Sequence, residues 1–596
     1  MRVEEGFQPI PFSEENAYTE DPVLPSLLRR ILPKGTFQEI EPDLERIGSE
    51  VVTSIRTLSD SAKCYPPKLL QYNQWGRRID ELQTSEGWRE LKEIAQREGL
   101  PGIFYERKHQ GHSRTYGFAK ILLMVGDTNE IFCPMSMTDG TARVIELLGS
   151  EEMKKDILPR LVSRDPKFAF TSGQWMTERP GGSDVSLTET TATSTGKSNK
   201  YGPQYTLNGF KWFSSATDSD VSVALARTGS QKEGSRGLSL FFVPLRLPLL
   251  RNPIDPVPSS TSNSILVHRL KNKIGTQVLP TAELSLEGTE AYLIGSLGKG
   301  VKSITPVLNI TRVWSAITSV GNLRKCLAIA TSYAKVRTIQ SGTLLLKDAP
   351  VHVERLASIN LLYRALTHLT LGVAGLLGKV ECGQATEDDG RRLRMLTPVA
   401  KAYAADKACA GMEEAMAAMG GAGYMEENGF GRMIRDSLVE KIWEGTIVVL
   451  ALDLAKVAQD PAAIKSFLSV LDRIITNTCP STLQSQLSSS LSVLKVAIQE
   501  FATSYERPLP PLIPRPALML AGAIASGVYL LEHAIWSHKN SEPTRDLDVE
   551  VFRRWVAESD LEAAIQSVEK AKSDSQERIR VNSALVFGLD AVKAKL

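Results

Sequence analysis

Cysteine and histidine are scarce in this sequence, and neither forms a recognisable ligand pattern. The six cysteines lie far apart among 596 residues and include no CxxC pair, which excludes a disulfide framework and a zinc-finger type of site. Of the seven histidines, only His109 and His112 are close neighbours, in a polar stretch without nearby cysteines. We therefore predict no metal site.

An excess of one charge and a long apolar run are also missing. The formal net charge is +2, so no overall basic field favours nucleic acid or an anionic membrane. The acidic N-terminus lacks the apolar centre of a signal peptide. The longest strongly apolar run, residues 517–531, is too short to span a bilayer. We predict that it forms a buried helix and that the chain has no membrane span.

The composition itself is that of an ordinary globular protein. Hydrophobic residues make up 42% of the chain and charged residues 23%, which are typical fractions. A chain of 596 residues exceeds what one hydrophobic core organises, so we expect about three or four units.

Hydrophobic periodicity predicts a mainly helical α+β protein with strands in its middle. Apolar residues recur at helical intervals over residues 46–165, with 133–138 as a connection between two helices. Short aromatic and β-branched runs between turn residues predict a β-barrel domain over 166–300. Helical periodicity returns over 301–462, and a Ser- and Pro-rich passage then leads into an appended helical unit, 463–596.

The two chain ends give separate hypotheses. Residues 1–45 are rich in proline and glutamate with little periodicity, which predicts an arm lying over the body. The chain ends in Ala594-Lys595-Leu596, a conservative variant of the Ser-Lys-Leu peroxisomal address. A Lys-rich helix end could finish in the same way, but we favour a peroxisomal location over a cytoplasmic one.

A glycine-rich loop and a carboxylate before an apolar helix suggest chemistry near residues 420–452. Gly420, Gly421 and Gly423 allow close approach of the backbone to a phosphate or ribose. Glu444 precedes a predicted helix start, where unpaired backbone N–H groups can polarise an acceptor. This combination suits a general base with an oxyanion-type site. Helix capping would explain the same residues without chemistry.

Two further stretches in the strand region suit a flat heterocyclic ligand. Residues 176–185 form a polar, glycine-containing loop after a strand, whose hydroxyl and N–H groups could bond a heterocycle edge and a pyrophosphate. Residues 208–215 combine aromatic side chains with a hydroxyl group, which suits one face of an isoalloxazine ring. A capped turn and ordinary core packing are the alternatives.

Together these motifs resemble the acyl-CoA dehydrogenase family. Their order is family-like: an MTE…GSD loop at 176–184, an NGxK strand at 208–211, a GGxGY loop at 420–424 and a WEGT turn at 443–446. The resemblance covers roughly residues 46–460. The double glycine of the first loop and the tryptophan before the glutamate are similar to the AidB-like branch, named for alkylation-response flavoproteins.

The resemblance implies an FAD-binding protein with helical, β-barrel and helical domains, usually a homotetramer. It makes Glu444 the base that removes the α-proton of an acyl thioester, while the β-hydrogen passes to the flavin and the Glu444 N–H helps to hold the thioester carbonyl. The implied cofactor contacts are Gln174, Met176, Thr177, Gly182, Ser183, Phe213, Ser214, Ser215, Arg337, Gly420, Gly421 and Thr446. The implied substrate contacts are Ser183, Arg312 and Gly445.

Three positions depart from the family pattern. The segment after Arg337 is one residue longer than usual and lacks the family's phenylalanine, Ala417 stands where a glutamine is usual, and Trp443 replaces tyrosine. The longer segment after Arg337 and the alanine at position 417 each weaken one expected FAD contact. The tryptophan at position 443 suggests a reshaped substrate pocket. We expect FAD binding to persist through the remaining loops.

Three functions are compatible with parts of this sequence. The first is an FAD-dependent dehydrogenase or oxidase, with oxygen as acceptor in a peroxisome or an electron-transfer flavoprotein elsewhere. The second is an AidB-like protective or DNA-binding role, which would need a basic surface. Residues 466–596 hold 14 Lys and Arg against 15 Asp and Glu, so only the local pair Arg553 and Arg554 favours nucleic acid. The third, a scaffold that has lost its cofactor, is disfavoured by the motifs retained.

Overall fold

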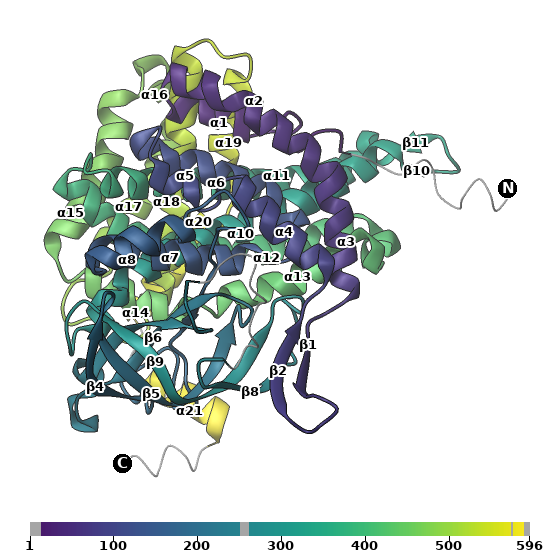
Figure 1. The fold of residues 1–596 in the computed structure, drawn as a ribbon. Coiled ribbons are helices and arrows are strands. Elements are labelled where there is room, and N and C mark those ends of the chain that lie inside the picture. The colour runs from purple at the N-terminus through teal and green to yellow at the C-terminus, as the bar shows by residue number, and fades with distance from the viewer. Residues whose placement is uncertain (1–13, 251–261, 574–575, 589–596) are drawn as a thin grey trace, which may run out of the picture.

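Helices cover a single β-barrel in the computed structural model, which describes residues 14–250, 262–573 and 576–588. Figure 1 shows the barrel at the bottom and the helices stacked above it. Helices from both ends of the chain lie side by side at the top of that stack, in purple and yellow. One hydrophobic cluster runs from Ala17 to Ala571, so helices α1 and α20 share a core with the middle of the chain, whereas α21 has no buried residue.

The N-terminal region is helical, as its periodicity predicts. Its helices are α1 (Leu24–Ile31), α2 (Lys34–Glu50), α3 (Arg56–Cys64), α4 (Glu86–Arg97), α5 (Gly102–Glu106), α6 (Ser113–Met124), α7 (Phe132–Leu148), α8 (Glu151–Asp156) and α9 (Leu158–Leu161). Ser85 caps α4 and Ser150 caps α8, each accepting a hydrogen bond from a backbone N–H in the first turn of its helix.

Three local expectations in this region are wrong. Residues 24–45 form α1 and most of α2 instead of an arm without periodicity. Pro25 stands in the first turn of α1, where no backbone N–H is needed, so it begins a helix rather than excluding one. Residues 133–138 belong to α7 and are not a connection. A hairpin of β1 (Lys68–Tyr72) and β2 (Arg78–Gln83) interrupts the helices.

The strands after residue 170 close into a barrel. They are β3 (Ser172–Trp175), β4 (Thr191–Asn199), β5 (Gly202–Ser215), β6 (Val221–Arg227), β7 (Leu238–Pro244), β8 (Ile265–Leu270) and β9 (Thr281–Ile294). The ring β4–β5–β9–β7–β6 returns to β4 through the Thr191–Arg227 pair, while β3 and β8 extend β6 and β9. Buried apolar side chains fill its interior. The predicted barrel is present, although the polar strand β4 was not recognised.

Long helices follow the barrel and carry the second group of motifs. They are α10 (Gly300–Val336), α11 (Pro350–Glu381), α12 (Glu387–Ala418), α13 (Phe430–Leu438) and α14 (Ile447–Val457). A two-residue-per-strand hairpin, β10 (Thr338–Ile339) and β11 (Leu344–Leu345), joins α10 to α11 and projects from the body in Figure 1.

The appended unit is also helical. It comprises α15 (Pro461–Asp472), α16 (Ser481–Gln486), α17 (Ser488–Ala502), α18 (Pro514–Lys539), α19 (Arg545–Glu558), α20 (Leu561–Ser573) and α21 (Gln576–Phe587). Among the described residues, two helices, α11 and α18, are long and apolar enough to cross a membrane, but 78% and 83% of these apolar windows are buried inside the protein. Their composition is therefore that of core helices, as expected for residues 517–531.

The N-terminal helix α1 is bonded to the appended unit. Arg30 Nη1 donates to Glu532 Oε2 at 2.6 Å, and Arg29 Nη1 donates to Glu542 Oε2 at 2.9 Å. The side chains of Leu24, Leu27 and Leu28 are buried in the shared core. Helix α1 thus packs on α18, the same long helix that α19 and α20 contact.

Candidate active site

Glu444 lies on a short turn between the 3-10 segment Val439–Lys441 and α14. Its φ is 57° and that of Gly445 is 106°, so two successive residues adopt the left-handed region. This conformation is uncommon for a glutamate and is a mark of local constraint. Thr446 then begins the helix, because its hydroxyl accepts a hydrogen bond from Val449 N at 3.3 Å.

The Glu444 carboxylate points at helix α10. Thr311 Oγ1 donates a hydrogen bond to Glu444 Oε2 at 2.5 Å. Thr311 is buried and its hydroxyl is near the Val307 carbonyl of its own helix, at 3.1 Å. The threonine is therefore a fixed partner that holds one oxygen of the predicted base.

Two cations hold the backbone of the same turn. Arg312 Nε donates to Glu444 O at 3.2 Å, and Lys401 Nζ donates to Gly445 O at 2.8 Å. Arg312 Nη1 also donates to Asp453 Oδ2 at 2.9 Å. Arg312, predicted as a substrate contact, is thus engaged with the turn itself, and the Gly445 carbonyl is engaged with α12.

Burial tunes the proton affinity of this group of side chains. Burial raises the pKa of Glu444, while the Thr311 hydrogen bond and the charges of Arg312 and Lys401 act in the opposite direction. Burial also raises the pKa of Glu440 to about 7 and lowers the pKa of Lys401 to about 8. A carboxylate with a raised pKa is suited to accept a proton near neutral pH.

Glu440 is a site residue that the sequence reasoning missed. Its Oε2 accepts hydrogen bonds from Ser315 Oγ and from Trp443 Nε1, the latter at 2.5 Å. Its Oε1 is buried and has no hydrogen-bond partner within the described residues. Glu440 lies four residues before Glu444, and this closeness in the sequence was the available signal. The Trp443 side chain is therefore explained in part by its bond to Glu440.

The polar loop after β3 is fixed to the barrel at both ends. Trp212 N donates to Thr177 O at 3.0 Å, which joins the loop to β5. Lys211 Nζ forms a buried ion pair with Glu178 at 2.6 Å, and Glu178 Oε2 also accepts from Glu189 N. A Cβ added to Gly182 would lie 3.0 Å from the Thr177 side chain, so the two residues are in close contact. Ser183 is exposed. Thr177, Gly182 and Ser183 therefore share one loop, as predicted.

The end of β5 presents an aromatic side chain beside unpartnered polar atoms. Phe213 is 49% exposed, with Lys271 Nζ 4.6 Å from its ring centroid. Ser214 Oγ and, on β3, Gln174 Oε1 are buried and have no hydrogen-bond partner within the described part of the chain. Since buried polar atoms are normally paired, these two atoms are the ones that a bound polar ring would satisfy. Met176 lies directly after β3 at intermediate exposure.

Hydrogen bonds at the end of β5 and electrostatic effects on Cys133 relate β5 to the Glu444 turn. Ser215 Oγ lies 3.1 Å from Thr281 Oγ1, which accepts a hydrogen bond from Lys273 Nζ at 3.0 Å. Burial lowers the pKa of Lys273 to about 8, against the charges of Cys133 and Glu130. Burial raises the pKa of the Cys133 thiol, and the Glu440 and Glu444 carboxylates contribute in the same direction. Lys273, beside the end of β5, and Glu444 therefore lie at one junction, around the Cys133 thiol.

The barrel and α13 touch at this junction. A Cβ on Gly275 would lie 2.2 Å from the Arg435 carbonyl oxygen, so only glycine permits this approach. The next residue, Thr276, donates its N–H to Asp436 Oδ1 at 2.5 Å. This close contact brings the loop between β8 and β9 to the helices that precede Glu444.

The remaining predicted cofactor residues lie elsewhere. Gly420 and Gly421 are exposed in the 3-10 segment Gly420–Tyr424, and a Cβ on either would meet no atom within 4 Å among the described residues. Arg337 follows the end of α10, beside the projecting β10–β11 hairpin. The contacts described for these three residues do not join them to Glu444 or Ser215. Their predicted role, which is to contact the FAD of a neighbouring subunit, stays a prediction.

Three family models match the chain in succession. Residues 7–166 match the adaptive response protein AidB N-terminal domain, residues 173–289 the acyl-CoA dehydrogenase middle domain, and residues 298–459 the acyl-CoA dehydrogenase C-terminal domain. The last two matches contain the β5 motif and the Glu444 turn respectively.

Individual proteins are similar to this chain along most of its length. Acyl-CoA dehydrogenase family member 11 of Caenorhabditis elegans is 35% identical over 93% of this chain and 90% of its own. Putative acyl-CoA dehydrogenase AidB of Escherichia coli is 27% identical over 78% of this chain and 81% of its own. A crystal structure of Caenorhabditis elegans ACDH-11 in complex with C11-CoA superposes with a TM-score of 0.87 at 32% identity, covering 99% of each chain.

Proposed function

The chain belongs to the acyl-CoA dehydrogenase family, and from this premise we propose that it oxidises an acyl thioester between the α and β carbons, with Glu444 as the base. FAD is its cofactor. The observation that carries the assignment of the base is the Glu444 turn itself, in which a buried carboxylate is held by the Thr311 hydroxyl and has its pKa raised by burial.

The residues at the end of β5 fit a flavin. Ser214 Oγ and Gln174 Oε1 are buried polar atoms without partners in the described chain, and the adjacent Phe213 ring is open to one side. Thr177, Gly182 and Ser183 lie on the fixed loop nearby and would hold the phosphates and part of the ring. When bound, FAD supplies the capacity to accept two electrons and the β-hydrogen of the substrate.

The chain's own residues perform the proton transfer and the positioning. Glu444 accepts the α-proton at one of its carboxylate oxygens, while Thr311 fixes the other oxygen and so orients the carboxylate. Arg312 and Lys401 hold the Glu444 and Gly445 carbonyls, which keeps the left-handed turn in one conformation. An N–H at such a fixed turn stabilises the enolate charge that develops on the thioester oxygen.

Anaerobic mixing with a panel of acyl-CoAs tests the proposal. We expect bleaching of the flavin absorbance with at least one thioester, and a slowing of about 10²- to 10⁴-fold in Glu444→Gln because a general base contributes that much. Equal bleaching rates in the two proteins would exclude Glu444 as the base. No bleaching with any thioester would favour the AidB-like protective role.

The nucleic-acid version of that second role has little support in the appended unit. Arg553 Nη1 donates to Glu550 and Arg554 Nε donates to Glu558, at 2.9 and 3.0 Å. Arg554 also pairs with Glu354 at 2.8 Å. The local basic pair is thus balanced by neighbouring carboxylates, so it supplies little net charge to a phosphate backbone.

We further propose that the enzyme is peroxisomal and that oxygen accepts its electrons. The support is the Ala594-Lys595-Leu596 ending, which lies outside the described residues. A fluorescent protein fused before the full chain should colocalise with a peroxisomal marker and lose that pattern when Leu596 is deleted. Oxygen consumption with the active acyl-CoA distinguishes an oxidase from a dehydrogenase that needs an electron-transfer flavoprotein.

We also propose a homotetramer. The support is that Gly420, Gly421 and Tyr424 of the Gly420–Tyr424 segment are exposed and that the exposed Met425 follows them, since exposed apolar groups beside a predicted cofactor loop suit a subunit contact. Light scattering during size-exclusion chromatography should give four times the chain mass of 65.4 kDa, and a monomeric mass would contradict the proposal.

A further inference from the structure

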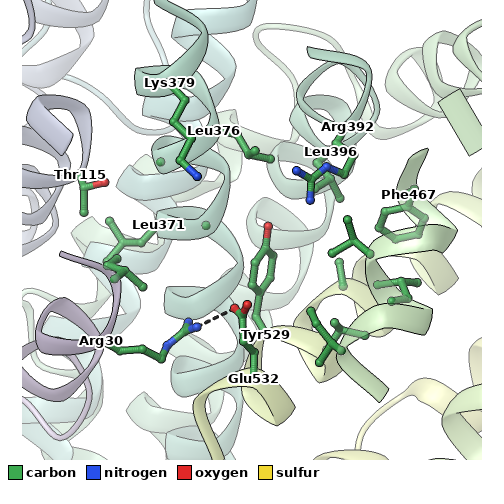
Figure 2. A pocket seen from close by; sticks show the side chains of 18 of the residues that line it. Arg30, Thr115, Leu371, Leu376, Lys379, Arg392, Leu396, Phe467, Tyr529 and Glu532 are labelled. Carbon is green, nitrogen blue, oxygen red and sulfur yellow. Dashed lines mark hydrogen bonds and ion pairs between the residues drawn. The ribbon is translucent and has the colours of Figure 1, made fainter. Parts of the chain in front are cut away.

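Helix α12 carries basic residues on two opposite faces. On one face, Arg392 helps to line a cavity of about 270 Å³ between α1, α11, α12, α15 and α18 (Figure 2). Arg392 is paired there with Asp389 of its own helix. Lys401 lies nine residues further on, about 180° around the helix at 3.6 residues per turn. It is buried and donates to the Gly445 carbonyl, so this second face brings a buried cation to the candidate active site.

Helix α10 holds two carboxylates side by side. Thr311 Oγ1 donates to Glu444 Oε2 at 2.5 Å, and Ser315 Oγ donates to Glu440 Oε2. Thr311 and Ser315 are four residues apart on α10, so their side chains are neighbours on one face of that helix. Both residues are buried. The carboxylates that they hold are therefore neighbours inside the protein.

Lys401 faces both of these carboxylates. Burial lowers its pKa to about 8, and the charges of Glu440 and Glu444 act in the opposite direction. One lysine therefore serves two acidic groups, of which the proposed reaction uses only Glu444. Two neighbouring buried carboxylic acids resist losing both protons, because the first charge opposes the second. We therefore expect the two groups to titrate as one unit.

The surroundings of the two groups assign the shared proton to Glu440. Arg312 Nε donates to the Glu444 carbonyl at 3.2 Å, and its charge opposes the burial that raises the pKa of Glu444. Glu440 Oε1, in contrast, is buried without a hydrogen-bond partner among the described residues. Burial and the Asp436 charge raise the pKa of the nearby Glu130, and the Glu440 charge adds to this effect. A charge on a carboxylate with one unsatisfied oxygen beside another acid is costly.

We propose that Glu440 and Glu444 form one carboxylate pair, in which Glu440 holds a proton and so leaves Glu444 charged as the base. This role of Glu440 builds on the proposed function, since it acts through Glu444 as a positioning residue. Below its pKa of about 7, Glu440 places no like charge beside the buried base. Burial raises the pKa of the nearby Cys133 thiol well above its ordinary value, and Lys401 has a pKa of about 8. Glu440 is therefore the first of these three to change charge as pH rises through 7.

Trp443 provides an optical probe of this proton. Its Nε1 donates to Glu440 Oε2 at 2.5 Å, so ionisation of Glu440 places a charge against the indole ring. We expect the tryptophan fluorescence of the full-length protein, titrated without substrate, to contain a step at about pH 7, the pKa to which burial raises Glu440. Glu440→Gln and Trp443→Phe should each remove this step. Absence of the step in the wild type, or its persistence in Glu440→Gln, would overturn the proposal.

Removing the other charge tests the coupling. In Glu444→Gln the midpoint of the step should fall by about one pH unit or more, the interaction at which two groups titrate as a pair. A role of Glu440 in packing alone would leave the midpoint unchanged, and that result would overturn the proposal. Ser315→Ala should move the midpoint upward, because the hydroxyl group stabilises the charged form of Glu440. Ser319→Ala is the matched control, since this buried serine of α10 bonds the Ser315 carbonyl and should leave the midpoint in place.

Flavin reduction connects the pair to the reaction. With an active acyl-CoA, the pH–rate profile of the wild type should contain, beyond the limb of Glu444, a second ionisation that reports the Glu440 pKa of about 7. Glu440→Gln should lack it, and a single ionisation in both proteins would overturn the proposal. Failure of the proposed function is distinguishable, because no thioester would then bleach the flavin while the substrate-free fluorescence titrations would still report the pair.

Discussion

Thr311 on α10 and Glu444 before α14 are 133 residues apart in the chain, yet the threonine hydroxyl lies 2.5 Å from the glutamate carboxylate. This bond is made to the charged form of the glutamate and lowers a pKa that burial raises. The orientation and the proton affinity of the base thus depend on the same hydroxyl group.

Replacing Thr311 by alanine should impair catalysis in a pH-dependent way. Loss of the hydrogen bond removes a stabiliser of the carboxylate, so the pKa of Glu444 rises and the activating limb of the pH–rate profile moves to higher pH. At neutral pH we expect kcat/KM to fall about tenfold, the value of one bond to a charged group. Stopped-flow flavin reduction across pH measures both effects.

Thr311→Ser is the control, since it keeps the hydroxyl and should restore the profile. An alanine variant with a lower rate but an unmoved profile would show that Thr311 acts only through packing.

Arg312 should behave as a positioning residue. Because its guanidinium joins the Glu444 carbonyl to Asp453, Arg312→Met is expected to lower kcat while leaving KM for the acyl-CoA little changed. Asp453→Asn, which loosens the same arginine without touching substrate, should give a smaller change in the same direction. A raised KM with kcat preserved in Arg312→Met would instead support the substrate contact that family resemblance implies.

Glu440 should make stability depend on pH. Its folded-state pKa, about 7 against an ordinary 4.5, means that the folded protein binds its proton more tightly than the unfolded chain does. The stability this provides is complete below the ordinary pKa and is lost as pH rises through about 7. Urea unfolding at a series of pH values should show the decline, about 3 kcal/mol at most, and Glu440→Gln should flatten it. A variant that retains the full decline would assign it to other groups.

We expect Lys211 and Glu178 to stabilise the folded protein only as a pair. Both side chains of this ion pair are buried, so Lys211→Met leaves a carboxylate uncompensated and should lower the free energy of unfolding by about 3–5 kcal/mol. Adding Glu178→Gln should recover much of the loss, because the glutamine oxygen still accepts the N–H of Glu189. Since Glu178 anchors the loop with Thr177 and Ser183, the single variant should also retain less FAD after gel filtration. Unchanged stability in the single variant would contradict the assigned role of the pair.

The parts of the structure that could be predicted from sequence are those with a clear local pattern of residue types. The β5 to β9 strands carry aromatic and β-branched residues between turns, and α10 to α12 carry long helical periodicity, so both regions are predicted correctly. Strand β4, which reads TATSTGKSN, is almost entirely polar and gives no such signal. Helix α1 was missed because residues 1–45 are rich in proline and glutamate and show little periodicity, although its proline lies in the first turn, where a helix tolerates it.

The chemistry of the site was predicted only where it is carried by a motif. Glu444 and the β5 end were found through sequence stretches that resemble a family, and the structure brings their surroundings to one junction. Thr311, Lys401 and Glu440 were missed because each is an ordinary residue on a helix, and only tertiary packing brings it to the turn. Lys401 stands alone among apolar residues of α12, which was the one visible sign of its burial.

The bond between Arg30 and Glu532 spans 502 positions of the chain. At a synthesis rate of about 5–20 residues per second, the ribosome needs roughly 25–100 s to deliver the glutamate after the arginine. Helix α1 therefore lacks its partner during nearly the whole of translation. During that time its leucines, which are buried in the folded protein, are still exposed. A nascent chain of this protein should need a chaperone most at the end that is made first.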